Sequence, residues 1–418
     1  MDNVKYRFLG IPIWEKRSGN LGTFKAPSSR LVDIMGGESS TGMAVTQNTA
    51  LTFSAVWACV RIISNTVAML PFGVYKTDSN GEKHRTPTHA SHRLIHSEPN
   101  QIQSSFTWRQ VMQAHATLKG NAYSIIKRNA MFRPVELKLI SNPDHVTPYE
   151  FEGDLYYKIQ GYDKPFLASD IFHIRGLGFD GLAGKSVLSV ARESIGSALA
   201  MQKYGGTIFK NGGAKRVALM HDTVVKDANV RKNITDSWNN TYGGPDKLNK
   251  VALIDAGFKV QEIGMNPEDA QFIGSREFSV NEIARYFGLI MDLLATDNNP
   301  TYASAEQRAL DFIKYTMTPW LVTWESEVNR KLFPDREKDT FYSKFTLEGL
   351  LRGDAAARAQ YYKDMFYIGA LSRDEIRQLE DRNKIAGGEK YYLQSNMAEA
   401  DKLQDIHNKN NTPKNENS

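Results

Sequence analysis

The hydrophobic residues of this chain change their spacing along the sequence, and this change limits the folds open to it. Between Val56 and Leu70 they recur at three- and four-residue steps, which predicts an amphipathic helix that stops before Pro71. Between 122 and 174 four short segments are instead rich in β-branched and aromatic residues: AYSIIKR, VELKLI, LYYKIQ and DIFHIR. Helical spacing resumes after Gly184. The sequence therefore predicts an α+β fold, with a β-rich segment packed on the preceding helices.

The same reasoning predicts further elements. Helices are expected at about 106–119, 187–202, 226–238, 267–287, 303–333, 354–366 and 372–381. Strands are expected at FGVYK before an Asn80-Gly81 turn, at RVALM, at FYSKFTL, and at KVALID and FKVQEI, which form a hairpin around Ala256-Gly257. The helix of 303–333 would be about 45 Å long at about 1.5 Å per residue, and Pro319 in its middle predicts a kink.

The two ends of the chain lack the pattern of a packed core. Residues 1–48 contain a Gly-, Ser- and Thr-rich stretch without periodicity, so they are predicted to form a flexible arm. Residues 394–418 are too polar to bury a core and are predicted to be disordered. The first ten residues do not form a secretory signal, so synthesis in the cytoplasm is expected. The apolar window 54–74 contains Arg61 and ends at a proline-glycine turn, which excludes a membrane span.

Size and composition narrow the class of protein. A chain of 418 residues is too long for one compact core and predicts two or three domains of about 100–200 residues. The 52 Lys and Arg exceed the 47 Asp and Glu by five, too few for a protein that coats nucleic acid. The single cysteine, Cys59, excludes a disulfide framework and a multi-cysteine zinc site. Because Cys59 lies on the apolar stripe of a helix, it is interpreted as a core residue and not as a nucleophile.

Two glycine motifs resemble nucleotide-binding loops, but each is incomplete. The segment 176–181 fits G-x-G-x-x-G, yet the required acidic residue about 20 positions later would be Glu193, which lies inside a helical stripe. Gly184-Lys185-Ser186 resembles the end of a P-loop, but Phe179 occupies the position where that loop needs glycine. A flexible turn before a helix is therefore favoured over a nucleotide site.

The histidines are also interpreted as structural. His89, His92 and His96 have helical spacing and lie close to His84, but no carboxylate is interleaved with them. No metal site, catalytic residue or cofactor is therefore expected.

Several phrases, in this order and spacing, resemble the HK97-type family of tailed-bacteriophage portal proteins. The resemblance runs from about Thr49 to Leu393. It depends on ALTFSAVWACVRIISNTVAMLPFGVYK, SEPN, LKGNAYSIIKR, DIFHIRGLGFDGLAGKSVLSVA, FKNGGAKRVAL, DAQFIGSREFSVNEIARYFGLIMDLL, YASAEQRALDFIKYTMTPWLVTWESEVNRKLF and LLRGDAAARAQYYKDMFYIGALSRDEIR. One departure is Leu289-Ile290-Met291, where the family usually has Val-Pro-Pro.

The resemblance implies a portal fold, with a mixed α/β wing, a helical stem, a small β-hairpin clip, a long kinked tunnel helix and a helical crown. In this sequence the regions are expected at 49–222 for the wing, 223–242 and 267–287 for the stem helices, 243–266 for the clip, 288–303 for the tunnel loop, 304–349 for the kinked tunnel helix with a strand returning to the wing, and 350–393 for the crown.

The resemblance also implies a ring, usually of twelve subunits, at one capsid vertex of the virion. Double-stranded DNA would enter through its channel under a separate terminase motor and later leave through it. The portal would catalyse nothing itself. Further partners would be the major capsid or scaffold protein and the head-completion or tail adaptor proteins, with no membrane partner.

The charge pattern is compatible with a channel through which DNA slides. The stretch 288–304 contains no Lys or Arg, so its polar tip would touch phosphates only by neutral or repulsive contacts. The candidate DNA-facing residues are Asp297, Asn298, Asn299, Thr301 and Tyr302. Residues 303–333 carry four acidic and four basic side chains, a local balance of zero.

Basic residues gather elsewhere. Lys203, Lys210, Lys215 and Arg216 occur in a window without acids and are interpreted as a solvated face. The clip candidates are Lys247, Lys250 and Lys259, for which a solvated face and a repeated basic band remain equal alternatives. Two other functions stay open: a head–tail adaptor ring without a DNA channel, and a nucleotide-dependent DNA-processing enzyme that uses the glycine turn.

Overall fold

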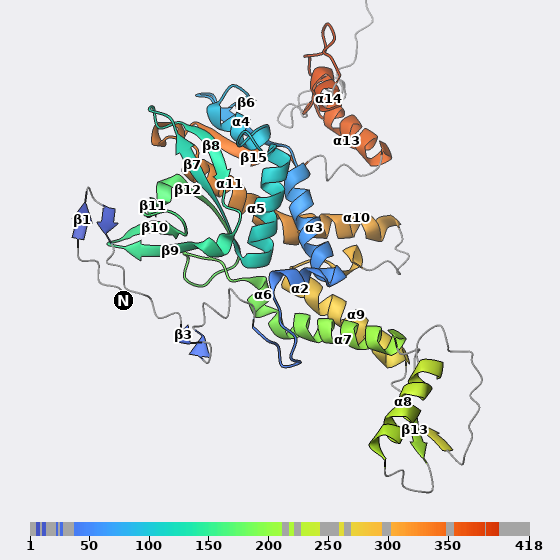
Figure 1. Cartoon of the computed structure of the whole chain (residues 1–418). Helices are drawn as coiled ribbons and strands as arrows, with labels where there is room; N and C mark the ends of the chain where they lie inside the picture. The colour runs from blue at the N-terminus through green and yellow to red at the C-terminus, as the bar shows by residue number, and fades with distance from the viewer. Residues whose placement is uncertain are drawn as a thin grey trace, which may run out of the picture. The chain divides into compact units, whose positions relative to one another are not determined.

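The computed structural model of the chain (Figure 1) describes residues 6–8, 11–13, 22–23, 26–27, 37–210, 217–220, 227–242, 259–262, 269–294, 302–347, 355–380 and 382–392. Contacts between residues divide the chain into two compact units, Met1–Thr346 and Leu347–Ser418. No helix within these described ranges is both long enough and apolar enough to cross a membrane.

Two helices form the first layer of the larger unit. Helix α3 (Ser54–Met69) packs along α5 (Ser105–Lys119), as Figure 1 shows. Helix α5 starts at Ser104, whose hydroxyl accepts a hydrogen bond from the Thr107 N–H, and ends at Gly120 in the left-handed region. Both predicted helices are confirmed, and so is the core position of Cys59, which is fully buried.

Three antiparallel sheets of three strands lie beside these helices. In the first, β7 (Asn121–Arg128) pairs with β8 (Pro134–Leu139) and β12 (Ile171–Arg175). In the second, β10 (Asp154–Ile159) lies between β9 (Val146–Phe151) and β11 (Phe166–Leu167). The predicted α+β class is therefore confirmed, because the described strands pair without parallel neighbours.

The third sheet joins distant parts of the sequence. Its central strand β5 (Phe72–Thr77) pairs with β6 (Lys83–Arg85) and with β15 (Phe341–Phe345). Phe72 and Phe345 face each other in the register, and their rings stack with centroids 3.9 Å apart. Strand β15, at the end of the larger unit, therefore pairs with the strand that directly follows α3.

A cluster of three aromatic rings holds the layers together. Trp108 of α5, Phe172 of β12 and Trp324 have ring centroids 5.3–5.7 Å apart. Both indole N–H groups are satisfied although buried, since Trp108 donates to the Ser124 hydroxyl and Trp324 to the Gln113 side-chain oxygen. This cluster is the centre of the core.

The predicted long helix is interrupted, and the interruption differs from a simple proline kink. Helix α10 (Tyr302–Asp311) continues into a π-helical segment, η5 (Phe312–Met317), and then into α11 (Thr318–Lys331). Pro319 lies in the first turn of α11, where a missing N–H costs little. The N–H and hydroxyl of Thr318 both donate to the Ile313 carbonyl, which closes the wider turn.

Two further helices lie side by side in the same unit. Helix α7 (Arg192–Lys210) packs against α9 (Asp269–Tyr286), and the short α6 (Val187–Val190) precedes α7. Helix α8 covers Ala228–Tyr242. The helices predicted in these stretches are therefore present.

One strand of the predicted clip has a partner that the sequence did not predict. Strand β14 (Lys259–Glu262) pairs with β13 (Val217–Met220). Strand β13 is the one predicted from RVALM, and the sequence analysis expected it in the wing. The KVALID segment and Ala256-Gly257, expected to form the hairpin, lie outside the described residues. Local alternation identifies a strand but not its partner, so the sequence could not reveal this pairing.

Part of the stretch 37–48 packs on α7, which corrects the expectation of a flexible arm at these residues. Val45 and Ser39 are buried, and the Ser40 hydroxyl and N–H donate to the Glu193 carboxylate of α7. The close contact between Ser39 and α7 depends on Gly196, because a Cβ at Gly196 would lie 2.1 Å from the Ser39 hydroxyl oxygen. Small residues predicted flexibility, but here they permit close packing.

The remaining elements are short. In the larger unit they are β1 (Tyr6–Phe8), β2 (Ile11–Ile13), β3 (Gly22–Thr23), β4 (Ala26–Pro27), α2 (Gln47–Leu51), α4 (Ala90–His96), η1 (Pro143–His145), η2 (Ala168–Asp170), η4 (Met291–Leu293) and η6 (Asp335–Glu337). The smaller unit contains α13 (Ala355–Tyr367) and α14 (Arg373–Leu379). Ser372 and Glu375 form a capping box at the start of α14. Residues 393–418 lie outside the described residues.

Candidate functional site

The candidate DNA-facing loop connects α9 to α10. Asp297, Asn298, Asn299 and Thr301 lie outside the described residues, and Tyr302 is the first residue of α10. What the structure does show is how the start of this loop is held.

The first end is fixed at Gly288, directly after α9. Gly288 adopts a φ of 64°, which a side chain would disfavour, and its carbonyl accepts a hydrogen bond from the Thr316 hydroxyl of η5. The N–H of Leu289 donates to the Ala284 carbonyl at 3.0 Å, and Leu289 itself is buried. The π-helical segment therefore anchors the chain where the loop begins.

The charges of 303–333 are not all on the surface, which changes the balance expected from the sequence. Glu327 and Lys331 are buried, and Glu325 accepts a hydrogen bond from the Phe345 N–H. Lys314 remains exposed and lies over the ring of Tyr315. The zero balance therefore describes the segment but not the surface that it presents.

The buried charges belong to a cluster around His173. Glu327 accepts a hydrogen bond from the His173 N–H at 3.2 Å and two from the guanidinium of Arg330. Burial raises the pKa of Glu327 despite its cationic neighbours, and burial lowers the pKa of Lys331 to about 8. For both groups the cost of burying charge exceeds the attraction between them, so this cluster is costly to form.

The hydrogen bonds of His173 define its tautomer. Asn121 Oδ1 can only accept, so His173 Nε2 donates to it at 3.0 Å, and His173 Nδ1 accepts from the Tyr157 hydroxyl. Burial first, and then nearby cations, hold the pKa of His173 well below its usual range, so the ring is neutral. The sequence pattern of the strand did not reveal this role.

The glycine turn between β12 and α6 is packed against backbone and does not form an open cradle. A Cβ on Gly184 would lie 2.1 Å from the Gly120 carbonyl oxygen, and the Gly176 N–H donates to that same oxygen. The side-chain amide of Asn121 donates to the Gly184 carbonyl and accepts from its N–H. The N–H of Gly184 is therefore used within the fold and is not free to bind a phosphate.

A cavity of about 400 Å³ borders this turn. Its charged lining includes Lys119, Lys185 and Arg192 together with Asp144 and Asp180. Lys119 forms an ion pair with Asp144, and Asp180 accepts hydrogen bonds from the N–H groups that follow it. The cavity carries both signs of charge and is not specific for an anion.

The helical histidines stabilise the fold, as the sequence predicts. The Val74 N–H donates to His92 Nδ1, and His89 Nε2 lies 3.1 Å from the Glu337 carboxylate. Burial lowers the pKa of His92 to about 4, with smaller contributions from His96, Arg85 and His89.

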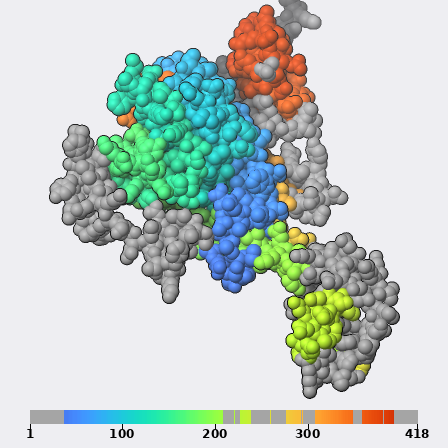
Figure 2. Space-filling view, viewed as in Figure 1, coloured from blue at the N-terminus to red at the C-terminus, as the bar shows by residue number. Residues whose placement is uncertain are grey.

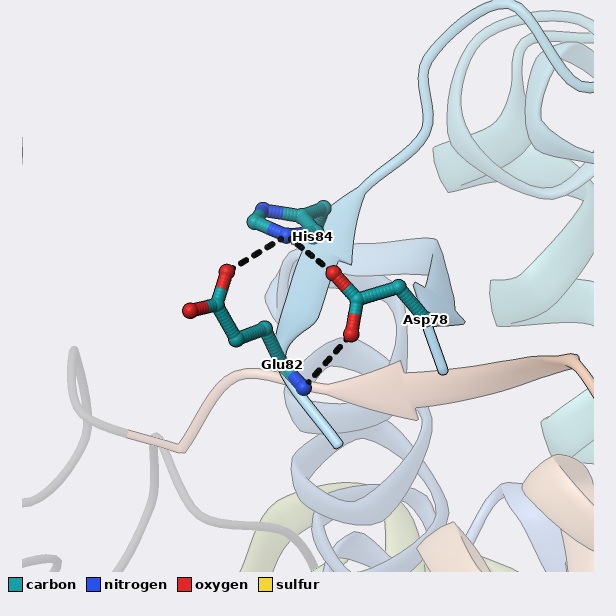
Figure 3. Close-up of side chains that lie close together, drawn as sticks. All are labelled: Asp78, Glu82 and His84. Atoms are coloured by element: carbon teal, nitrogen blue, oxygen red, sulfur yellow. Dashed lines mark hydrogen bonds and ion pairs between the residues drawn. The ribbon is translucent and has the colours of Figure 1, made fainter. Parts of the chain in front are cut away.

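A group with metal-ligating side chains occurs instead in the β5–β6 turn (Figure 3). His84 Nε2 lies 3.3 Å from the Asp78 carboxylate and 3.4 Å from that of Glu82. Asp78 also accepts hydrogen bonds from the N–H groups of Asn80 and Glu82, which closes the turn. His84 is mostly exposed. The hydrogen bonds of the turn explain why these three side chains lie close together, and no metal ion is needed to explain it.

The basic candidates are only partly described. Lys259 begins β14 and is exposed, and Lys203 is exposed on α7. Lys247, Lys250, Lys215 and Arg216 lie outside the described residues, and Lys210 is the last residue of α7.

Comparison with known proteins shows which family this chain matches. Residues 54–381 match the family model for phage portal proteins. The portal protein of Enterobacteria phage HK97 is 31% identical over 343 residues, which cover 81% of each chain.

Solved structures show the same fold. One is a crystal structure of an HK97-family phage portal protein from Corynebacterium diphtheriae, with a TM-score of 0.55 and 18% identity over 73% of this chain and 96% of that chain. Another, with a TM-score of 0.55 and 18% identity, is from the neck of a native gene transfer agent particle computed with C12 symmetry, and covers 81% of this chain and 92% of that one.

The α+β architecture is thus the fold of HK97-family phage portal proteins. The chain belongs to the phage portal protein family.

Proposed function

We propose that this protein is the portal subunit of a tailed bacteriophage, and that its ring forms the channel at one capsid vertex through which double-stranded DNA is packaged and ejected and to which the tail is joined. The observation that carries the proposal is the family match over 54–381, which includes every described element from α3 to the turn after α14. The protein would be made in the host cytoplasm and would act in the virion.

The ring would contain twelve subunits. The structurally similar neck protein with C12 symmetry supports this number. A closed ring requires that each subunit present two different surfaces to its two neighbours. Exposed apolar side chains outside the core, such as Trp57, Tyr315 and Val322, are available for such contacts.

The loop of 288–303 would line the narrow part of the channel. Its lack of Lys and Arg suits a surface along which DNA slides, because each phosphate contact by a cation adds affinity that translocation must break. The anchoring of Gly288 by Thr316 supports a defined position for the start of this loop. Asp297, Asn298, Asn299, Thr301 and Tyr302 remain the proposed DNA-facing residues.

The stretch 243–266, which contains β14, would form the clip, and α8 would be one of the two stem helices. Lys247, Lys250 and Lys259 would form a repeated basic band in the clip, which binds the terminase during packaging and the head-completion proteins afterwards. The major capsid or scaffold protein would contact the region of 49–222, the proposed wing.

The portal would act without catalysis. The packed glycine turn supports this, because the Gly184 N–H is hydrogen-bonded to Asn121. The test is ATP hydrolysis by the purified ring: measurable turnover that Lys185→Ala abolishes would contradict a passive channel.

Electron microscopy of the purified full-length protein tests the central claim. We expect top views of a ring with an axial hole about 20–40 Å wide, since the hole must pass duplex DNA, whose grooves alone are about 12 and 6 Å wide. A ring without a hole would favour the head–tail adaptor.

A further inference from the structure

The hairpin of β5 and β6 gathers three side chains of the kinds that bind transition metals. The ligand atoms of Asp78, Glu82 and His84 all lie within 4.8 Å of one another (Figure 3). Among the residues that the structure describes, no other three His, Cys, Asp or Glu side chains come this close together. An imidazole nitrogen together with carboxylate oxygens is a ligand set of zinc and of other divalent transition metals.

The distances fit a tetrahedral ion better than they fit two hydrogen bonds. His84 Nε2 lies 3.3 Å from Asp78 Oδ2 and 3.4 Å from Glu82 Oε2. With metal–ligand bonds of about 2.0–2.2 Å, two ligands of tetrahedral zinc lie about 3.3–3.5 Å apart. Charge-assisted N–H···O bonds are shorter, about 2.7–2.9 Å, and one ring nitrogen has at most one proton to offer two carboxylates. An ion between the three atoms would bind all of them at once.

The turn holds its aspartate in position for such an ion. Asp78 Oδ1 accepts hydrogen bonds from the N–H groups of Asn80 and Glu82 at 3.0 and 2.9 Å, which leaves Oδ2 directed at His84. Gly81 adopts a φ of 83°, which allows the chain to reverse between the two strands. Hydrogen bonds of this kind orient the carboxylate ligands of metal sites. The three ligands are therefore brought together before an ion arrives.

The group is open to solvent. The side chains of His84 and Glu82 are 60% and 67% exposed. Figure 2 shows the part of the chain that contains this hairpin in light blue at the surface of the larger unit. An ion can therefore enter without any rearrangement of the core, and a water molecule can complete its coordination.

The charges of the hairpin suit a divalent cation. The two carboxylates contribute two negative charges, and the imidazole contributes a nitrogen lone pair. Lys83 and Arg85 flank His84 in β6, so the alternation of the strand directs them to its other face. Lys76 lies opposite His84 in the register, but it is exposed, so water and salt screen its charge.

We propose that Asp78, Glu82 and His84 form a binding site for a divalent transition metal, Zn²⁺ in particular, with water as the fourth ligand. Asp78 directly follows β5 and His84 lies within β6. A bound ion would therefore tie the exposed edge strand β6 to the rest of its sheet. The role of this site is structural, and it does not depend on the proposed ring or channel.

Calorimetric titration of the full-length protein, purified without a histidine tag, tests the site. We expect one Zn²⁺ to bind per chain, and His84→Gln and Glu82→Gln each to weaken this binding by at least about tenfold. Because both side chains are exposed, neither substitution disturbs the core. His145→Gln is the matched control, since it removes another exposed histidine and should leave the affinity for Zn²⁺ unchanged.

Hydrogen exchange shows where the ion binds. The N–H of Asp78 donates to the Glu82 carbonyl, and the N–H of Thr86 donates to the Val74 carbonyl, so both report opening of the hairpin. At a free Zn²⁺ concentration of about ten times the dissociation constant, opening that releases the ion should be suppressed about tenfold. We expect exchange at 78–86 to slow by this factor in the unsubstituted protein and in His145→Gln, and not to change in His84→Gln.

Three results would overturn the inference. The first is equal affinity for Zn²⁺ in His84→Gln and in the unsubstituted protein. The second is binding of Mg²⁺ or Ca²⁺ as tight as that of Zn²⁺, because these ions prefer oxygen ligands and would not need the histidine. The third is exchange at 78–86 that Zn²⁺ leaves unchanged. None of these results would bear on the proposed portal function.

Discussion

Some glycines of this protein are packed against backbone atoms and others face open space. Substitution by alanine distinguishes the two kinds, because only the packed glycines leave no room for a Cβ. Gly184→Ala would force a Cβ against the Gly120 carbonyl, a backbone atom that cannot rotate away, so we expect a loss of about 1–3 kcal/mol. Gly206→Ala is the matched control, because Gly206 is exposed on α7 with no atom within 4 Å of the new Cβ. It should gain about 0.5–1 kcal/mol. Urea unfolding measures both, and equal midpoints would contradict the packed-turn interpretation.

His115 makes the larger unit sensitive to acid. Burial, with a smaller contribution from Lys119, lowers the pKa of His115 to about 4, and its Nδ1 has no hydrogen-bond partner. Between pH 6.5 and 4 the unfolded chain binds a proton that the folded chain does not, so stability falls as the pH falls through this window. The full contribution is about 3 kcal/mol at most.

A neutral replacement should remove this part of the pH dependence. We expect His115→Gln to lose less stability than the unsubstituted protein between pH 6.5 and 4, as measured by thermal unfolding at several pH values. His84→Gln, at a mostly exposed position, is the control and should follow the unsubstituted curve. If the stability of His115→Gln falls with pH as steeply as that of the unsubstituted protein, the prediction is wrong.

At the scale of elements, the π-helical segment between α10 and α11 is joined by a hydrogen bond to the start of the loop that precedes α10. Thr316→Val keeps the shape of the side chain but removes the hydroxyl that donates to Gly288, which should cost about 1–2 kcal/mol. We expect faster hydrogen exchange at 288–294. In Thr323→Val the lost bond is to Pro319 within α11, so exchange at 288–294 should not change.

The loop itself should be dispensable for assembly. Deleting Asp297–Asn299 is expected to leave the ring intact in electron micrographs but to impair DNA packaging or retention, because the deleted residues face the channel in the proposed ring. A deletant that fails to assemble would show that the loop is structural.

At the scale of the whole molecule, ring symmetry multiplies each substitution. In the proposed ring of twelve subunits, Asn298→Lys would add twelve positive charges to the proposed channel, and we expect DNA packaging to slow most at low salt, where phosphate contacts are strongest. Asn298→Gln is the neutral control. Packaging rates at two salt concentrations measure the effect, and a rate that does not depend on salt would contradict a DNA-facing loop.

The elements could largely be predicted from the sequence, because local spacing reports which face of a helix or strand is apolar. The helices α3, α5, α7 and α9 and the strands of the β-rich segment follow from that spacing. The candidate tunnel-loop and clip residues were chosen from family resemblance and charge, and those assignments remain proposals.

Partners in space could not be predicted. The pairing of β14 with β13, the packing of residues 37–48 on α7 and the π-helical segment before Pro319 each depend on contacts between distant segments. The same holds for the buried cluster of Glu327, Lys331 and His173, whose residues appear in the sequence as ordinary polar positions.

The sequence by itself determined the α+β class, the order of the elements and the family, since these depend on local hydrophobic spacing and on phrases along the chain. Only the tertiary structure decided which glycines are packed, which charges are buried and which apolar side chains remain exposed. Burial is a property of all the segments that surround a residue, so it could not be predicted from the spacing of residues along one segment.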